Sequence, residues 1–524
     1  MKKKMVVLIL ALAMIFSLIA CASSETPTDT TAPTNTGTQV NTGTPAVTRD
    51  PVEINVGVYQ FPNSLEVLSE NIAIGRTILH NHVYDRLVKF DPNSNEWLPS
   101  IAKSWERVGN DAWTFEIDLS YVFSNGDPLT MDDIVYSIER LKDVPKQVDI
   151  GNLVKSVTYD GNTLTLVGTS SAAAIASRVL SVAIIVNKSY IENGGDDALN
   201  MRPIGTGPYT VTEFTPGSSC TIELWDGYPF EKPQIDKINF FLIAETASRY
   251  IAVETGLMNF VNQLTPYEMQ MAEDDAGLST LTGDSRMDVV FIINCAKPPF
   301  DNVNVRRALA YAFDRASFCL LQGGRLAEET TLFCGYDDLR HVSSNLPDYN
   351  LDRAREMLEA EGYSGSNPLR FELSVNGTSD PGLEMYQSTL RSIGVDMTIN
   401  VKEFSVYLAS EMSGEFDINY TVLGTVGATP LEFLDRYDIN MLGARNVSRY
   451  SNDHVQEIIE QMRIENDQQA LRRMAVEISD IIAQDVPLIP VYLLQTYCAM
   501  DKGLTGVIID RNRIINFLNA TYTS

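Results

Sequence analysis

Ser100 and Lys103 have the spacing of a candidate catalytic pair. In the pattern S-x-x-K, the serine hydroxyl can act as a nucleophile and the lysine amine as its base. The motifs that complete such a site, K-T-G and S-D-N, do not occur in the chain, and neither do G-x-S-x-G and H-E-x-x-H. We therefore expect no covalent chemistry and predict that the protein is not an enzyme.

Histidines, the usual metal ligands, are scarce. The chain has four, at His80, His82, His341 and His454. His80 and His82 are two residues apart, a spacing that points both rings to one side in a strand but not in a helix. Residues 72–79 have a helical pattern, so surface or capping roles are favoured over a metal site. We predict no cofactor, while a nickel chelate held by one histidine stays open.

The cysteines show no metal-binding pattern. Five follow Cys21 at scattered positions: Cys220, Cys295, Cys319, Cys334 and Cys498. There is no C-x-x-C pair, which argues against a zinc site. A disulfide is compatible with a location outside the cell, and Cys319 with Cys334 is the favoured pair. Because the number is odd, at least one free thiol is expected.

Cys21 ends a segment with the order of an export signal. Lysines at positions 2–4 precede an apolar run over residues 5–16, which is too short for a membrane span that stays. The next residues, L-I-A-C ending at Cys21, resemble the lipobox of bacterial lipoproteins. That resemblance implies cleavage before Cys21 and a diacylglycerol on its thiol. We predict a signal peptide over residues 1–20 and a protein anchored to a membrane outside the cytoplasm.

A low-complexity segment follows the lipobox. Residues 22–50 are almost entirely Thr, Ser, Pro, Ala, Gly and Asn, which cannot bury enough apolar surface to offset the entropy lost on folding. Residues 21–51 are therefore predicted to be a flexible tether. Such a stalk suits a thick-walled, Gram-positive cell surface.

The remaining residues, 52–524, exceed what one hydrophobic core usually serves, so at least two lobes are expected. The chain has 40 basic and 68 acidic residues, a net charge of −28. This charge disfavours nucleic acid as a partner.

Strand and helix patterns alternate through the chain. Residues 52–58 alternate as a half-buried strand, and Thr130 with Asp133 has the spacing of a capping box that begins a helix. Helices are predicted after Asn350 and over 385–393 and 471–482, with strands over 369–375 and 395–401. This order is typical of α/β proteins, in which ligands bind at strand ends.

Five phrases in order resemble the extracellular solute-binding protein family 5, which serves peptide, nickel and oligopeptide ABC importers. They are W-L-P-S-I-A-K-S-W-E from Trp97, F-S-N-G-D-P-L-T from Phe123, P-I-G-T-G-P-Y from Pro203, K-P-P-F-D from Lys297 and V-R-R-A-L-A-Y-A-F-D-R from Val305. We interpret these phrases as mainly structural: Gly205 and Gly207 permit close backbone approaches. Arg306 and Arg307 are expected to be solvated or paired with acids.

The resemblance implies a two-lobe, periplasmic-binding-protein-like α/β fold of class II, with an extra subdomain inserted in the first lobe. The predicted parts are lobe one over 52–289, its inserted subdomain over about 83–197, lobe two over 290–490, and a C-terminal segment, 491–524, that returns to lobe one. Crossings between the lobes are expected at 290–294 and 486–492. Hinge closure around a solute would be the working motion.

The candidate ligand contacts lie at predicted strand ends. They are Tyr59, Gln60, Phe61, Asn376, Gly377, Gly424, Thr425, Val426, Gly427 and Tyr492. A packing role is an equally favoured alternative for Tyr59, Gln60, Phe61, Asn376, Gly377 and Tyr492.

The stretch around Thr425 departs from peptide-binding relatives. Those carry a glycine-tryptophan phrase followed by an aspartate that pairs with the ligand's ammonium group. Here Thr425 replaces the tryptophan, and no aspartate occurs before Pro430. Since a buried unpaired ammonium costs several kcal/mol, we expect that a peptide's free amino terminus is not held in this way. In the alternative, the alignment is shifted and Glu432 or Asp435 supplies the carboxylate.

The resemblance thus implies a substrate-binding lipoprotein of an ABC importer. Its expected partners are a small peptide or other small solute, the permease subunits and, through lipid, the membrane; it is expected to be a monomer. Two alternatives stay open: a signal-peptide receptor on the same scaffold, and a binder of a non-peptide solute such as an oligosaccharide or nickel chelate.

Overall fold

The computed structural model describes residues 50–524 except 71–72, 81, 92–95, 170–171, 173–174, 195, 284–286, 322–327, 330–344, 377–380, 424–432, 466, 511–512 and 524. The chain divides after Asp50, and Pro51–Ser524 contains every helix and strand given below. In this described part, no helix combines the length and the apolar composition needed to cross a membrane. The predicted signal peptide and Cys21 lie outside the described residues.

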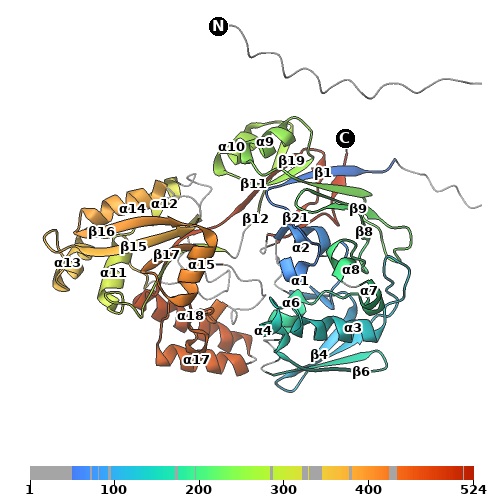
Figure 1. Ribbon diagram of the computed structural model, residues 1–524, viewed down its shortest axis with the longest axis horizontal. Coiled ribbons are helices and arrows are strands. Elements are labelled where there is room, and N and C mark those ends of the chain that lie inside the picture. The colour runs from blue at the N-terminus through green and yellow to red at the C-terminus, as the bar shows by residue number, and fades with distance from the viewer. Residues whose placement is uncertain are drawn as a thin grey trace, which may run out of the picture. The chain divides into compact units, whose positions relative to one another are not determined.

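A mixed sheet forms the centre of what we call lobe one (Figure 1). Its order among the described residues is β12-β19-β11-β1-β10-β9-β8. The strands are β1 (Glu53–Val58), β8 (Tyr209–Thr215), β9 (Ser219–Leu224), β10 (Lys237–Leu242), β11 (Phe260–Leu264), β12 (Leu278–Gly283) and β19 (Thr496–Asp501). β1 runs parallel to β10 and β11, and the other pairs are antiparallel.

The predicted alternation in β1 is confirmed, and it explains why the strand is central. Ile54, Val56 and Val58 are fully buried in the main core of lobe one. On the opposite face a Cβ at Gly57 would come within 3.1 Å of Ile243 and Val261. Helices α9 (Thr246–Glu254) and α10 (Pro266–Asp274) cover that face with a separate small core.

A second sheet is inserted in the chain between β1 and β8. It has the order β4-β5-β7-β6, with β4 (Ala102–Val108), β5 (Ala112–Ile117), β6 (Val154–Asp160) and β7 (Thr163–Gly168). We call this part the inserted subdomain. The helix α3 (Met131–Glu139) packs beside it, and the predicted capping box is confirmed because Thr130 and Asp133 bond each other's backbone amides.

Short elements connect these sheets and close lobe one. They are α1 (Val67–Glu70), α2 (Ala73–Leu79), β2 (Val88–Asp91), β3 (Glu96–Pro99), η1 (Arg140–Lys142), α4 (Val148–Gly151), the π-helical turn η2 (Ile175–Val179), α6 (Leu180–Val182), α7 (Lys188–Gly194), α8 (Asp196–Asn200), β20 (Leu504–Thr505), β21 (Ile508–Ile509), β22 (Ile515–Asn516) and β23 (Thr521–Tyr522). One hydrophobic core joins the seven-stranded sheet to the inserted subdomain.

What we call lobe two is built on a sheet with the order β14-β18-β13-β17-β15-β16 among the described residues. Its strands are β13 (Asp288–Ile293), β14 (Glu328–Glu329), β15 (Leu369–Asn376), β16 (Val395–Lys402), β17 (Ile418–Leu423) and β18 (Leu488–Leu493). Its helices are α11 (Val303–Tyr311), α12 (Arg315–Leu321), α13 (Leu351–Ala360), α14 (Pro381–Arg391), α15 (Phe404–Ser413), η5 (Ile439–Met441), α17 (Asp453–Ile464) and α18 (Gln468–Asp485). The helices and strands predicted in this half are confirmed to within a few residues.

Both faces of the lobe-two sheet are buried. Along β13, Val289, Phe291 and Ile293 point into one core, and Val290 and Ile292 point into another. Every residue of this strand is buried, because alternate side chains point to opposite faces of the sheet and both faces are covered.

The predicted crossings at 290–294 and 486–492 are wrong. These segments form most of β13 and β18, inside the lobe-two sheet. The chain passes between the sheets after β12 ends at Gly283 and before β13 begins at Asp288, and again after β18 ends at Leu493 and before β19 begins at Thr496. The apolar, proline-containing segments are therefore the strands next to the crossings. They are apolar because these strands are buried on both faces of the sheet.

The family phrases have structural roles that differ in part from those expected. The close approach at the glycines is confirmed, because a Cβ on Gly205 would lie 1.9 Å from the Val83 carbonyl oxygen. The expectation is wrong for Arg306, which is buried and donates to the carbonyls of Phe300 and Asp485. Arg307 is partly exposed, as expected, and donates to the Gln484 carbonyl.

Candidate functional site

The carboxyl ends of the parallel strands in lobe one meet at one edge of the sheet. Tyr59 and Gln60 follow β1 directly, and Gln263 lies near the end of β11. The antiparallel strand β19 begins at the same edge with Thr496. Four polar side chains therefore gather where ligands of α/β proteins usually bind.

A matching edge in lobe two faces the first. β15 and β17 are parallel and end at Asn376 and Leu423, and their antiparallel neighbour β13 begins there with Asp288. β18 ends at the same edge with Leu493. Because the chain runs directly from these strand ends to those of lobe one, the two edges lie next to each other. We call the two facing edges the junction.

Arg513 connects the two crossings at the junction. Its Nε donates to Thr496 Oγ1 at 3.1 Å, and its Nη1 lies 3.6 Å from the sulfur of Met287. In the described part of the chain, Arg513 forms no ion pair with a carboxylate. Burial lowers the pKa of its guanidinium, and the nearby Tyr59 phenol and Cys498 thiol act in the opposite direction. The charged group is partly desolvated without a counter-ion, which favours an anionic ligand group beside it.

The backbone at this point is strained. Arg513 has φ +64° and Gln263 has φ +53°, values that side chains other than glycine adopt at a cost. Gln263 Nε2 lies 3.5 Å from Thr496 Oγ1, the same hydroxyl that accepts from Arg513. Two strained residues thus share one buried hydroxyl at the junction, and such clusters are common at ligand sites.

Two further arginines lie near Tyr59. Arg249 is buried and donates to the carbonyls of Ile243, Ala244, Asn262 and Gln263, so its guanidinium fixes the loops after β10 and β11. Burial lowers the pKa of Arg76, while Asp510 and Tyr59 raise it. Tyr59 therefore lies near several guanidiniums, and carboxylates also lie beside Arg76 and Arg249.

The predicted contacts fall into three groups. Tyr59 and Gln60 are half-buried at the junction, and Asn376 is exposed at the end of β15. Phe61 is 7% exposed and belongs to the core of lobe one. Tyr492 is half-buried in β18, with its ring 6.4 Å from that of Phe318. The other five, Gly377, Gly424, Thr425, Val426 and Gly427, lie outside the described residues.

Sequence reasoning missed Arg513, Gln263 and Thr496. None belongs to a motif, and they come from a loop and two strands far apart in the chain. Only the pairing of β19 with β11 brings Thr496 and Gln263 together.

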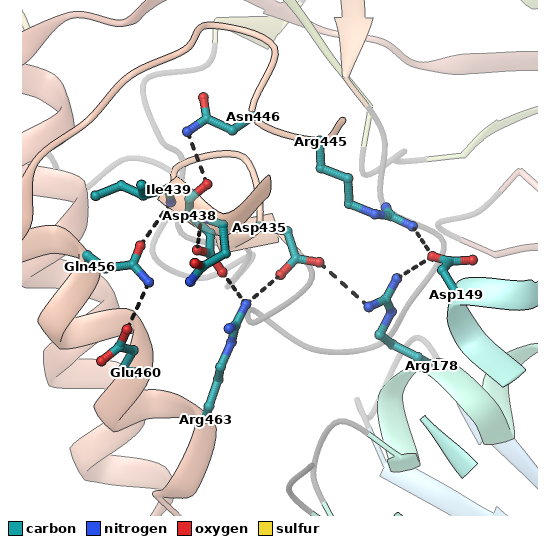
Figure 2. Close-up of polar contacts among 11 residues, drawn as sticks. Asp149, Arg178, Asp435, Asp438, Ile439, Arg445, Asn446, Gln456, Glu460 and Arg463 are labelled. Carbon is teal, nitrogen blue, oxygen red and sulfur yellow. Dashed lines mark hydrogen bonds and ion pairs between the residues drawn. The ribbon is translucent and has the colours of Figure 1, made fainter. Parts of the chain in front are cut away.

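Farther from the crossings, charged side chains connect the inserted subdomain to lobe two (Figure 2). Arg178 Nη1 lies 3.8 Å from Asp435 Oδ2, and Arg445 Nη2 lies 3.4 Å from Asp149 Oδ2. Arg178 also pairs with Asp149 at 3.0 Å inside the subdomain. In lobe two, Arg463 Nη2 lies 3.3 Å from Asp435 and also pairs with Asp438.

These contacts bear on the alternative that Asp435 receives a ligand's ammonium group. Asp435 is only 6% exposed, and burial raises its pKa while Arg178 and Arg463 lower it. The protein's own guanidiniums already stand beside both carboxylate oxygens. Asp435 is therefore engaged within the protein in this structure. Glu432 lies outside the described residues.

The residues considered as catalytic or metal-binding candidates have structural roles. Lys103 pairs with Asp118 at 3.5 Å and is exposed, whereas the Ser100 hydroxyl is buried. His80 and His82 are buried, so the favoured surface role is wrong. His82 Nδ1 lies 2.8 Å from the Thr77 carbonyl, and its Nε2 accepts from the Phe517 amide. Among the described residues, no group of three or more His, Cys, Asp or Glu side chains is placed to hold a metal ion.

The predicted disulfide cannot be assigned, because Cys334 lies outside the described residues. Cys319 is buried, with its sulfur 3.8 Å from the Val491 carbonyl. Cys220, Cys295 and Cys498 are free thiols, and burial raises the pKa of Cys220 and of Cys295 to about 12. These thiols are protonated and unreactive at neutral pH.

A cavity of about 380 Å³ lies elsewhere on lobe one. Its walls are Lys89, Pro208, Tyr228, Glu231, Lys232, Pro233, Gln234, Leu518, Asn519, Ala520 and Thr521. All of them come from lobe one, so a ligand there would not touch both lobes. The junction is the better candidate because strand ends of both sheets lie beside the crossings there.

Two lobes joined by two crossings, with polar strand ends facing each other, define the class of two-lobe binding proteins. Residues 96–440, more than half of the chain, match the model of the bacterial extracellular solute-binding proteins, family 5. The chain belongs to this family, as the five sequence phrases indicated. Its members are solute-binding proteins that act outside the cytoplasm.

Known proteins agree with this assignment. The dipeptide-binding protein of Escherichia coli (strain K12) is 25% identical over 373 residues, which cover 64% of this chain and 68% of the relative. The oligopeptide-binding protein AppA of Bacillus subtilis (strain 168) is 25% identical over 470 residues, covering 82% and 84%. The structure of HbpA2 from Haemophilus parasuis has a TM-score of 0.78 at 20% identity and covers 90% of this chain and 100% of that chain. The predicted two-lobe α/β fold is confirmed.

Proposed function

We propose that the protein captures a small peptide or peptide-like solute outside the cytoplasm and delivers it to the permease of an ABC importer. The observation that carries this proposal is the junction, where strand ends of two separate sheets lie beside both crossings. Hinge closure at two short crossings would enclose a solute between these edges. The dipeptide- and oligopeptide-binding relatives favour a peptide as the solute.

The proposed ligand carries a free carboxylate and needs no free ammonium group. Arg513 offers a partly desolvated guanidinium at the junction without a carboxylate partner among the described residues. Asp435, by contrast, is already next to two guanidiniums of the protein. A peptide with a blocked amino terminus and a free carboxyl terminus fits both observations.

Native mass spectrometry of the purified protein tests the ligand class first, because a co-purified ligand reveals its mass. Calorimetric titration then compares free, N-acetylated and C-amidated forms of the same peptides. We expect acetylated peptides to bind as tightly as free ones and amidated peptides to bind more weakly. Tight binding abolished by acetylation would refute the proposed ligand chemistry, and no binding of any peptide would refute the peptide class.

Delivery is tested separately from capture. Uptake of the identified ligand should be lost in cells that lack the protein. Unchanged uptake, with binding intact, would favour a sensing role on the same scaffold. Hydrolysis of the bound peptide would contradict the proposal that the protein is not an enzyme.

A further inference from the structure

Six charged side chains, two from the inserted subdomain and four from lobe two, form a row (Figure 2). In order, the row is Arg445, Asp149, Arg178, Asp435, Arg463 and Asp438. Arginine and aspartate alternate, so each of the four inner groups lies between two opposite charges and the row has no net charge. Within the row, two contacts between described residues pass between the parts: Arg178 with Asp435 and Arg445 with Asp149.

The lobe-two half of the row is fixed in place by hydrogen bonds. Asp438 Oδ1 accepts from the Asn440 amide, and the Asp438 carbonyl accepts from Asn446. The following amide, that of Ile439, donates to Gln456 on α17, the helix that also carries Arg463. Asp438 is thus fixed beside Arg463, which also pairs with Asp435, before any contact with the subdomain forms, and this reduces the entropy lost on contact.

Each half also keeps an internal ion pair when the contacts between the parts break. Asp149 remains with Arg178 in the subdomain, and Asp435 and Asp438 remain with Arg463 in lobe two. Separation therefore leaves neither half with a buried charge that has no partner, the situation that makes breaking a buried pair so costly. Such contacts can form and break reversibly.

The row is separated from the crossings. In Figure 1, α4, which carries Asp149, lies near the lower end of the view beside α17 and α18, whereas β12 and β19 lie toward the upper end. Closure about the crossings would bring the charged surfaces together, and opening would part them. Contacts far from a hinge oppose its opening most effectively because opening displaces them most.

We propose that these six side chains form an ionic latch that shifts the equilibrium of the two lobes toward the closed state. The latch acts whether or not a ligand is bound, so it goes beyond the proposed function and does not depend on the identity of the solute. The contact of Arg445 with Asp149 is partly exposed, so salt weakens it, whereas the contact of Arg178 with Asp435 is largely buried.

The test measures opening without ligand. Arg445→Gln removes one contact between the parts and leaves the pair of Arg178 with Asp149 and the pairs of Arg463 in place. Arg178→Gln removes the other contact. Arg353→Gln is the control, because it breaks an exposed ion pair with Glu356 inside lobe two. Small-angle scattering of each purified full chain at low salt and at about 0.5 M salt gives the open fraction.

We expect either latch variant to raise the ratio of open to closed molecules about 3- to 10-fold at low salt. The wild type and the Arg353→Gln variant should open as salt rises, and the latch variants should respond much less. Equal scattering and equal salt dependence for Arg445→Gln and the wild type would overturn the latch. Thermal unfolding identifies any misfolded variant, and Arg445→Gln, at an exposed side chain, keeps the test valid if Arg178→Gln fails to fold.

Failure of the latch and failure of the proposed function give different results. Without a latch, the salt dependence of opening disappears, but peptide binding remains. If the protein binds no peptide, the open fraction of the unliganded chain can still be measured and still decides whether the latch exists.

Discussion

Among single residues, Arg513 is the ligand contact that we propose and that the sequence did not single out. This arginine contacts Met287 in one crossing and Thr496 just after the other. A ligand carboxylate bound to it would therefore be held by both connections between the lobes. Tyr59, which the sequence predicted, lies near it.

Arg513→Met should weaken binding of a peptide with a free carboxylate about 10- to 100-fold, because a hydrogen bond to a charged group contributes about 1.5–3 kcal/mol. Binding of the C-terminal amide should change little. Calorimetry of both peptides measures the difference. Arg353→Met, exposed on α13, serves as the control and should bind as the wild type does. If Arg513→Met weakens binding of the free-carboxylate peptide and of its C-terminal amide equally, Arg513 does not contact the ligand carboxylate.

His82 makes the stability of lobe one sensitive to acid. Burial lowers its pKa from 6.5 to about 4, and the hydrogen bond with Thr77 opposes this only partly. Between these two pH values the unfolded chain binds a proton that the folded chain does not, so the free energy of unfolding falls as pH decreases. The loss from this one residue is about 3 kcal/mol at pH 4.

Chemical denaturation at pH 7 and at about pH 4 measures this loss. His82→Gln should reduce the difference between the two pH values, although it also lowers stability at pH 7 by disturbing the bond to the Phe517 amide. His454→Gln, an exposed histidine on α17, is the control and should keep the full difference. If the difference in unfolding free energy between pH 7 and pH 4 is the same in His82→Gln as in the wild type, His82 is not the cause of the acid sensitivity.

Among the helices, strands and loops, the family phrases act mainly by positioning neighbouring segments. The segment containing Gly205 and Gly207 passes against the backbone of His82 and Val83, and the Gly207 amide donates to the Val83 carbonyl. Backbone can approach backbone this closely only where no Cβ intervenes. The glycines thus connect the start of β8 to the end of α2, and so help to hold the loops of lobe one in place.

Gly205→Ala should destabilise the protein by more than about 3 kcal/mol, because the new Cβ would overlap the Val83 carbonyl and force the backbone apart. Gly365→Ala is the control, since a Cβ at that position would meet no atom within 4 Å and the backbone there does not have a positive φ. Thermal unfolding of the two variants gives the comparison. Similar melting temperatures would show that the close approach is dispensable.

For the molecule as a whole, we propose that a lipid anchor and closure of the two lobes act together. The predicted lipid on Cys21 and the tether would keep the binding unit near its permease. A single lipidated residue with a flexible tether places a solute-loaded protein at high local concentration next to its target.

Cys21→Ala should move the protein from the membrane fraction to the medium or leave it unprocessed, because no lipid can be attached. Immunoblots of cell fractions, with mass spectrometry of the wild-type amino terminus, measure this change. Cys220→Ala, at a buried thiol in β9, is the control and should remain in the membrane fraction. A variant that stays membrane-bound, with a wild type that carries no lipid, would contradict the anchor.

The family, the α/β class and most helices and strands of lobe two could be predicted from the sequence alone. These follow from local causes: the Asn350 cap, the positive φ at Gly362 and Gly394, and the alternation in β16 all act over a few residues. The side chains of Tyr59, Gln60 and Asn376 were located at strand ends for the same reason.

Which side chains meet became known only from the three-dimensional arrangement. Strand order brings Gln263 and Thr496 together although 233 residues separate them, and Arg445 meets Asp149 across 296 residues. The three-dimensional arrangement also shows that the crossings lie outside the apolar segments and that Arg306, His80 and Phe61 are buried. A local pattern records how a segment folds, but a contact between distant segments depends on the pairing of strands and the closure of lobes, which no short stretch of sequence contains.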